Sequence, residues 1–188
     1  MSKVTIQGDA SGTGIFTIAS PNSNTDRTLV LPDEAGTVLT TATPGVPVNG
    51  PAFSAYQGAN QAITNNTWTK LQMNTENFDT NSDYDTSTYR FTPSVAGYYQ
   101  ISTSIRNFSN SSISYAFVGV YKNGTGWKDA AVPVYLANYA VGGLTALVYL
   151  NGTSDYVETY AFILSGGTNT VELNFSQSNF SGALVRAA

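Results

Sequence analysis

The sequence predicts an all-β protein, and three observations lead to that expectation. Short alternating runs of apolar and polar residues recur about every ten residues after residue 52, and Gly or Asn separates them. No stretch has the apolar spacing of an amphipathic helix. Aromatic residues make up 12% of the chain and charged residues only 11%, a mixture that suits pleated sheets and tight turns.

The segment 99–105 shows the alternation most clearly, because apolar residues and Thr103 occupy its odd positions and polar residues its even positions. Such a pattern predicts a strand with one buried face. The Asn-Gly pairs at 123–124 and 151–152 fall between further runs and predict hairpin turns. Other strands are predicted at 114–121, 144–150, 156–164 and 171–175.

About eight to ten strands in the second part of the chain indicate an antiparallel sandwich of two sheets. A jelly roll and an immunoglobulin-like sandwich both fit, and periodicity alone does not choose between them. A chain of 188 residues is long enough to bury such a core without disulfides.

The chain is expected to have a short first module, residues 1–43, followed by a Pro-rich linker, residues 44–51, and a sandwich domain, residues 52–188. The first module contains three short strand-like runs, 15–18, 27–31 and 37–40. Its large apolar residues are too few for an independent core, because modules below about 50 residues rarely close one without a metal or disulfide. We therefore expect it to attach to a partner surface, and the residues expected to do so are Ile15, Phe16, Ile18, Leu29, Val30 and Leu31.

Composition excludes several classes of function. The chain has no Cys and no His, which rules out disulfides, thiol nucleophiles, Cys/His zinc sites and every catalytic triad with an imidazole base. Its net charge of −4, with no basic cluster, makes nucleic acid an unexpected partner. The start, MSKVTIQGD, lacks the apolar core of a signal peptide, and later apolar runs are short. We expect a soluble protein that is not an enzyme, needs no cofactor and does not enter a membrane.

One acidic segment resembles the first half of a calcium loop, with Asp79, Asn81, Asp83 and Asp85 at alternate positions. Arg90 stands where the bidentate acid of such a loop belongs, and the required Gly is absent. Capping of turns is the favoured interpretation of these acids and calcium binding the alternative.

Glu158 and Glu172 lie in alternating predicted strands, so they could be neighbours and form the carboxylate pair of a glycosidase. The simpler interpretation is that each is a solvent-exposed acid on the polar face of its strand.

Several motifs resemble, in the right order, the globular head of the complement and tumour necrosis factor superfamily. They are FSAYQ at 53–57, FDTNSDYDTSTYRFTPSVAGYYQIS at 78–102, YLNGTSDYVETYAF at 149–162 and NFSGALV at 179–185. The resemblance implies a ten-stranded jelly roll that assembles as a tight trimer. The sequence has no collagen stalk, leader or cysteine, so we do not carry over the family's role in immune recognition. The segment 12–38 resembles one found near the start of bacteriophage virion proteins and fibres.

The sandwich also carries more aromatic residues than a single core easily absorbs, which suggests that some are buried between subunits. The residues expected in the trimer interface are Tyr99, Tyr115, Phe117, Tyr160 and Phe162.

Together these observations predict a trimeric capsid decoration or cement protein of a bacteriophage. It would be assembled in the host cytoplasm and anchored to the major capsid protein, or another virion protein, through its first module. The alternative is a short tail or head fibre whose tip binds a host surface glycan. Decoration is preferred because the linker is short, has no heptad or other repeat, and spans about 30 Å at most.

Overall fold

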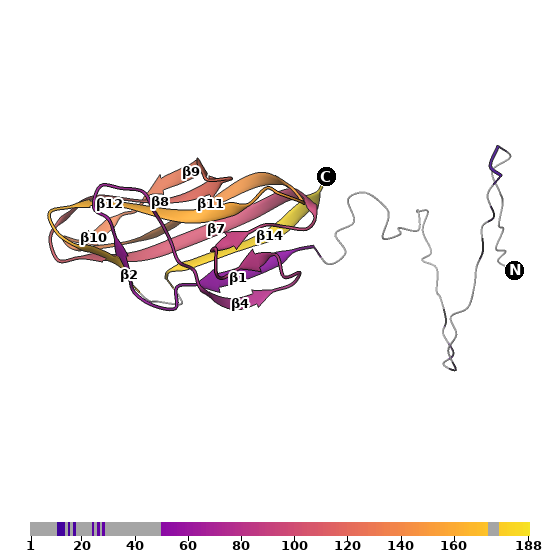
Figure 1. Cartoon of the computed structure of the whole chain (residues 1–188), viewed down its shortest axis with the longest axis horizontal. Helices are drawn as coiled ribbons and strands as arrows, with labels where there is room; N and C mark the ends of the chain where they lie inside the picture. Colours follow the sequence, from indigo (N-terminus) through magenta and orange to yellow (C-terminus); the bar gives the residue numbers. More distant parts are fainter. Residues whose placement is uncertain are drawn as a thin grey trace, which may run out of the picture. The chain divides into compact units, whose positions relative to one another are not determined.

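Residues 50–172 and 177–188 form a β-sandwich in the computed structural model of the chain (Figure 1). The structure also describes residues 11–13, 15, 17, 24, 26 and 28. Backbone contacts divide the chain into two units, Met1–Thr37 and Val38–Ala188. The second unit contains the sandwich, and we call residues 50–188 the head.

The first of the two sheets, sheet A, has eight strands. Its main path runs β10 (Val134–Leu136), β11 (Tyr139–Asn151), β7 (Ala96–Ser109), β14 (Asn179–Ala187), β1 (Ala52–Tyr56) and β4 (Thr75–Asp79). Two short strands lie off this path. The strand β13 (Asn169–Val171) pairs with the last residues of β7, and β2 (Gln61–Ile63) pairs with β13.

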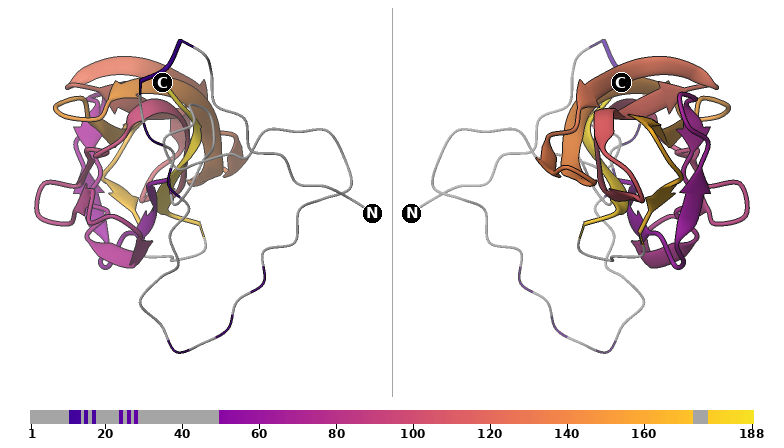
Figure 2. Two further views of the ribbon diagram at one scale, coloured as in Figure 1. Left: turned by 90° about the vertical axis from the view of Figure 1, so that its right-hand side faces the viewer. Right: turned by 90° about the vertical axis from the view of Figure 1, so that its left-hand side faces the viewer.

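Sheet B has six strands. Its main path runs β5 (Tyr84–Asp85), β6 (Arg90–Phe91), β12 (Val157–Ser165), β8 (Ile113–Lys122) and β9 (Thr125–Ala131), and β3 (Thr69–Lys70) also pairs with β12. The strands of both sheets surround a single interior when the head is viewed along its length (Figure 2).

The head is an all-β jelly roll, as the sequence predicts, and every strand pairing in the described residues is antiparallel. The described residues contain fourteen strands rather than the expected ten. The difference comes from short pieces, because β2, β3, β5, β6, β10 and β13 have only two or three residues each.

The alternation predicted for 99–105 is confirmed within the longer strand β7, whose odd-numbered residues are buried. The predicted hairpin at 123–124 is also confirmed, since it joins β8 to β9. The one predicted at 151–152 is wrong, because Asn151-Gly152 leads from β11 of sheet A to β12 of sheet B, which do not pair. Asn123 and Gly124 both have positive φ, 52° and 76°, as a tight two-residue hairpin turn requires. Of the predicted strand 171–175, residue 171 ends β13 and residues 173–176 lie outside the described residues.

The core is centred on aromatic residues that come from motifs far apart in the sequence. The Phe53 ring stacks on Phe91 and Tyr84, with ring centres 4.3 and 4.9 Å apart, and meets Phe180 edge-on. Tyr99 packs edge-on against Phe91, and its hydroxyl donates to the Val95 carbonyl. The motifs that carry the family resemblance therefore converge in one core.

The head begins and ends at the same end of the sandwich. Ala52, at the start of β1, pairs with Ala183 near the end of β14, and the Ala188 amide donates to the Ala96 carbonyl. The opposite end carries β10 and β2 (Figure 1). We call it the distal end, because Ala52 and Ala188, at the two ends of the head, lie away from it.

Of the residues expected to attach the first module to a partner, Ile15 is described and its side chain is 93% exposed. The others, Phe16, Ile18, Leu29, Val30 and Leu31, lie outside the described residues.

Candidate functional site

The outward-facing side chains of β1, β14, β7 and β11 form one continuous surface of the head. Across β7 and β11, the register pairs Tyr98 with Tyr149, Gln100 with Leu147, and Ser102 with Thr145. We call this surface the sheet A face. It consists of Ala52, Ser54, Tyr98, Gln100, Ser102, Ser104, Gly143, Thr145, Leu147, Tyr149, Ser181, Ala183 and Val185.

None of the residues of the sheet A face is charged. Arg106 and Arg186 border it at its two ends along β7 and β14, and Arg186 is the register partner of Tyr98. Most of its residues are small, and the exposed large apolar side chains are Tyr98 (45%), Leu147 (58%), Tyr149 (40%) and Val185 (55%). Charge depletion around a few exposed aromatic and aliphatic side chains is typical of the centre of a protein interface.

Two shallow hollows, of about 350 and 320 Å³, lie next to each other on this surface and share Ser102. The first is bordered by Phe78 and Val185, and the second by Leu144 and Asn179. Their openness and lack of charged groups fit the packing of protein side chains better than the capture of a charged small molecule.

A third hollow, of about 390 Å³, lies at the distal end, and its lining residues are Arg106, Tyr135, Leu136, Tyr139, Val141 and Gln177. Tyr135, on the edge strand β10, is 84% exposed. The Arg106 guanidinium lies 5.3 Å from the centre of the Tyr139 ring, and its Nε is 2.9 Å from Oε2 of Glu172. The hollow thus combines two aromatic rings with a guanidinium that an acid holds in place.

The outer face of sheet B carries an aromatic cluster with Trp68 at its centre. The Trp68 ring lies 5.7 Å from Phe162, 5.8 Å from Tyr121 and 6.4 Å from Phe117, measured between ring centres. A Cβ atom added to Gly119 would lie only 3.1 Å from the Trp68 ring. The glycine thus leaves room for the indole to lie against β8, and the cluster is packed within one subunit.

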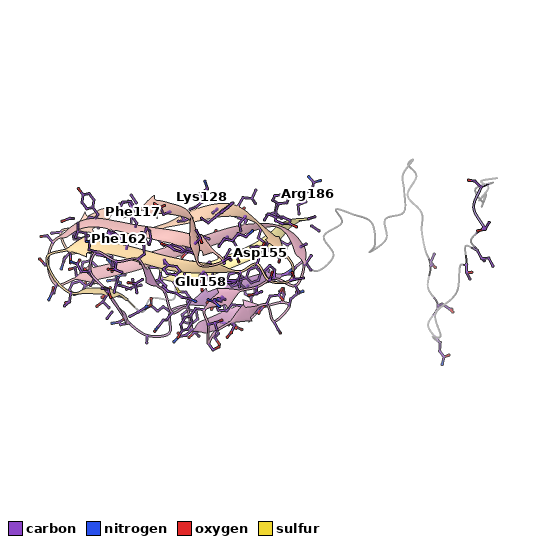
Figure 3. The ribbon with its side chains drawn as sticks, turned by 45° about the horizontal axis from the view of Figure 1, so that its top comes forward. Phe117, Lys128, Asp155, Glu158, Phe162 and Arg186 are labelled. Atoms are coloured by element: carbon purple, nitrogen blue, oxygen red, sulfur yellow. The ribbon has the colours of Figure 1, made fainter. Side chains whose placement is uncertain are left out.

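The aromatic residues that the sequence predicts in the trimer interface lie in different environments in the structure. Phe117 and Phe162 lie on neighbouring strands β8 and β12 and belong to the Trp68 cluster (Figure 3). Tyr160 stacks on Tyr121 with ring centres 3.9 Å apart. Tyr115, on the same face of β8, is 59% exposed.

Tyr99 does not agree with the predicted interface role, because its side chain is fully buried in the core of the subunit. Its neighbour Tyr98 points outward instead and belongs to the sheet A face. Sequence reasoning missed Tyr98, Leu147 and Tyr149 as surface groups, although the alternation of β7 separates Tyr98 from Tyr99.

Glu158 is not the exposed acid that the sequence suggests. Its side chain is only 1% exposed, and Oε1 accepts hydrogen bonds from Lys70 Nζ and, at 2.7 Å, from Arg90 Nε. The hydrogen bond with Glu158 raises the pKa of Arg90. Burial, together with the nearby Glu158 charge, raises the pKa of Tyr160 to about 12. Lys70 and Arg90, which are partly exposed, form ion pairs with the buried Glu158 carboxylate and tie β3, β6 and β12 together.

Glu158 and Glu172 do not form a carboxylate pair. Glu158 lies on β12 of sheet B, whereas Glu172 follows β13 of sheet A and is ion-paired with Arg106. No glycosidase-like arrangement of these two acids is present.

The acidic segment 79–85 caps turns, as the favoured interpretation holds. Asp79 accepts from the Tyr84 amide at 2.7 Å, Asp83 from the Ser94 amide at 3.0 Å, and Asp85 from Ser87 at 2.6 and 2.8 Å. Hydrogen bonds from the side chain of Ser87, and then that of Thr88, lower the pKa of Asp85. Among the residues that the structure describes, no three acidic, His or Cys side chains are placed to hold a metal ion.

The described part of the chain contains no helix that is long and apolar enough to cross a membrane. No protein-family model matches the chain, and no curated protein matches it.

Solved structures do match the head. The globular domain of zebrafish complement 1qA protein matches with a TM-score of 0.52 and 17% identity, over 74% of this chain and 99% of that chain. The head has the complement and tumour necrosis factor jelly-roll fold. Eiger TNF from S. frugiperda matches with a TM-score of 0.52 and 8% identity, over 78% of this chain and 96% of that chain.

A third structure links this fold to a phage. Vertex protein P5 of phage PRD1 matches with a TM-score of 0.53 and 16% identity, over 72% of this chain and 97% of that chain. At these identities, the matches establish the fold of the head.

Proposed function

We propose that this chain is a non-enzymatic structural protein of a bacteriophage virion, a trimeric decoration or cement protein with an outward-projecting head. The observation that carries the proposal is the uncharged sheet A face, on a fold that a phage vertex protein shares. The family resemblance of the sequence motifs, which implies a trimer, supports it further.

The sheet A face is the surface we assign to trimer contacts. A sheet face that stays in water usually carries charged or long polar side chains, whereas this one presents small residues around Tyr98, Leu147 and Tyr149. Small side chains allow a neighbouring subunit to approach closely, and the aromatic and aliphatic groups supply area that is buried on contact. This assignment replaces the predicted aromatic residues of sheet B, where Phe117 and Phe162 already pack against Trp68 and Tyr160 against Tyr121.

Attachment to the particle is assigned to residues 1–43, joined to the head by the Pro-rich linker 44–51. The head begins at the end opposite β10, so a particle that holds the first module leaves the distal end facing outward. The first module adds strands or loops to the major capsid protein or another virion protein. Three linked copies multiply three weak contacts into a tight attachment.

The test compares particle binding by the full chain, by a chain lacking residues 1–43, and by the full chain with Ala183→Arg. Ala183 is exposed in the sheet A face, so an arginine there would place a charge in the trimer contact. We expect the truncated chain to remain trimeric but lose particle binding, and Ala183→Arg to give a folded monomer that binds weakly. Binding by the truncated chain would overturn the attachment role of residues 1–43, and a trimeric Ala183→Arg variant would overturn the assigned interface.

The second candidate is a short fibre whose distal end binds a host glycan, and the hollow beside Tyr135 favours it. Tyr135 and Tyr139 offer rings for stacking against a sugar, and Arg106 offers donors to sugar hydroxyls. A glycan array probed with the wild type and with Tyr135→Ala tests this function, with Tyr115→Ala as an exposed-tyrosine control on sheet B. Binding that only Tyr135→Ala abolishes would favour the fibre, and no binding to host envelope sugars would exclude a glycan-binding tip.

A further inference from the structure

The inward face of β7 becomes polar toward the distal end of the head. Ile101 and Ile105 are followed by Asn107 and Ser109, all fully buried. Ser109 has a partner, because its hydroxyl donates to Ser165 Oγ at 3.0 Å, and Ser165 in turn donates to Asn169 Oδ1 at 2.8 Å. The Asn107 side chain, in contrast to Ser109, has no hydrogen-bond partner among the described residues.

Both polar atoms of the Asn107 side chain, Oδ1 and Nδ2, are buried without a hydrogen-bond partner among the described residues. Gln57, which follows β1 and is 1% exposed, has one satisfied atom, since its Nε2 donates to the Val171 carbonyl at 3.1 Å. Its Oε1 is buried and also lacks a partner in that part of the chain. Most buried polar groups in proteins are hydrogen-bonded, so the unpaired atoms of Asn107 and Gln57 call for a partner.

Both amide-bearing residues neighbour Val171. Val171 of β13 is the register partner of Asn107 on β7, and the carbonyl of the same valine accepts the Gln57 hydrogen bond. The register partner of Asn107 on its other side is Ala140 of β11. Val171, Ala140 and the preceding inward residue Ile105 are all fully buried and offer no side-chain hydrogen bond.

We propose that Gln57 and Asn107 together bind an internal water molecule between the two sheets. The orphaned atoms include both a donor and acceptors, so the ligand must donate and accept hydrogen bonds. It must also be small and neutral, because Val171, Ala140 and Ile105 beside Asn107 are apolar. The charged residues next to Asn107 and Val171 in the chain, Arg106 and Glu172, pair with each other. Water meets these conditions, and buried waters typically bridge two to four such groups.

The bound water links β7 and β13, which pair with each other over three residues, to Gln57 at the end of β1. Two other polar groups in the interior, the hydroxyl pair of Thr103 and Thr159 and the cluster of Ser109, Ser165 and Asn169, have partners within the protein. The water supplies the missing hydrogen bonds of the third, Gln57 and Asn107. This site belongs to the interior of each subunit and does not depend on the proposed function.

The first test is nuclear magnetic resonance of the full-length wild-type chain. We expect cross-relaxation between the Asn107 side-chain amide protons and a water that stays bound for longer than nanoseconds. Absence of such a signal, with the Asn107 amide protons assigned and observed, would overturn the proposal.

The second test counts long-lived internal waters by ¹⁷O relaxation dispersion in the wild type and in Asn107→Leu, which has nearly the same shape but no polar atoms. We expect Asn107→Leu to lose at least one such water. Thr103→Val is the matched control, because Thr103 is equally buried in β7 but bonds to protein atoms, and it should keep the wild-type count. An unchanged count in a folded Asn107→Leu chain would overturn the proposal, and if this variant does not fold, the wild-type measurement alone decides.

Discussion

Tyr149 on β11 lies directly opposite Tyr98 on β7, with ring centres 5.5 Å apart and ring planes inclined by 60°. The two rings contact each other across the strands, yet each keeps 40% or more of its surface in water. They form the aromatic part of a sheet face that carries no charge. Mutation of this pair therefore tests the proposed trimer interface directly.

Replacing both tyrosines by serine should weaken assembly far more than it weakens the fold. In the isolated subunit, an exposed cross-strand aromatic pair contributes about 0.5–1 kcal/mol. Buried between subunits, the same rings would each contribute more than 1 kcal/mol to assembly. Losing both should therefore raise the concentration at which half of the trimer dissociates at least about tenfold. Sedimentation of Tyr98→Ser/Tyr149→Ser over a dilution series measures the effect, with Tyr115→Ser on sheet B as the control. Equal dissociation of the wild type and the double variant would show that these tyrosines do not lie in the interface.

The contact between Trp68 and Gly119 predicts a double-mutant cycle. Gly119→Ala should destabilise the head by about 1 kcal/mol, because its new Cβ lies 3.1 Å from the indole and the ring must shift. Trp68→Ala should cost about 2 kcal/mol through lost packing against Phe117 and Phe162.

In the Trp68→Ala background, Gly119→Ala should cost little, because the ring that it displaces is gone. Chemical denaturation of the four proteins gives the coupling free energy. Strict additivity would show that the indole does not lie against Gly119.

The two sheets share a hydrogen bond at the centre of the core, where the hydroxyls of Thr103 and Thr159 are 2.8 Å apart. Thr103→Val alone should destabilise the head by about 1–2 kcal/mol, because it removes one partner of a buried hydroxyl. Thr103→Val with Thr159→Val should cost clearly less than the sum of the single changes, since the double variant leaves no unpaired hydroxyl. Thermal unfolding of the three variants checks this, and costs that simply add would contradict the contact.

Asp155 predicts a loss of stability in acid. Hydrogen bonds from Asn123 at 2.7 Å and then from Lys122 at 2.9 Å lower its pKa below the ordinary value of 3.8. A carboxyl whose pKa is lowered by folding stabilises the protein above its unfolded pKa, and that contribution is lost as the pH falls through the folded value. Unfolding free energy should therefore decrease below about pH 4 in the wild type and decrease less steeply in Asp155→Asn.

The control for this prediction is Asp129→Asn, which removes an exposed acid from β9 and leaves the hydrogen bonds of Asp155 in place. Parallel profiles for the wild type and Asp155→Asn between pH 2 and pH 5 would show that the Asp155 contacts contribute no linkage.

The sequence predicts the sandwich well where the evidence is local. The alternation along β7 and the Asn123-Gly124 turn follow from neighbouring residues, and both occur in the structure. Tyr99 shows the limit of reasoning from composition. An excess of aromatic residues suggests an interface, but the alternation already places Tyr99 on the buried side with Ile101 and leaves Tyr98 outside.

Contacts between distant residues could not be predicted in this way. The buried state of Glu158 depends on Lys70 and Arg90, which lie 88 and 68 positions away along the chain. The partner of Phe117 and Phe162 is a tryptophan in the loop before β3, and nothing near either phenylalanine in the sequence indicates it.

The mass of the full-length chain in dilute solution tests the account most directly, because attachment through linked copies requires that the sheet A face be covered by other subunits. Light scattering of the purified wild type should give about 60 kDa, three times the 19.9 kDa of one chain, across micromolar dilution. A folded species of about 20 kDa at the same concentrations would contradict the proposed trimer and the interface assigned to it.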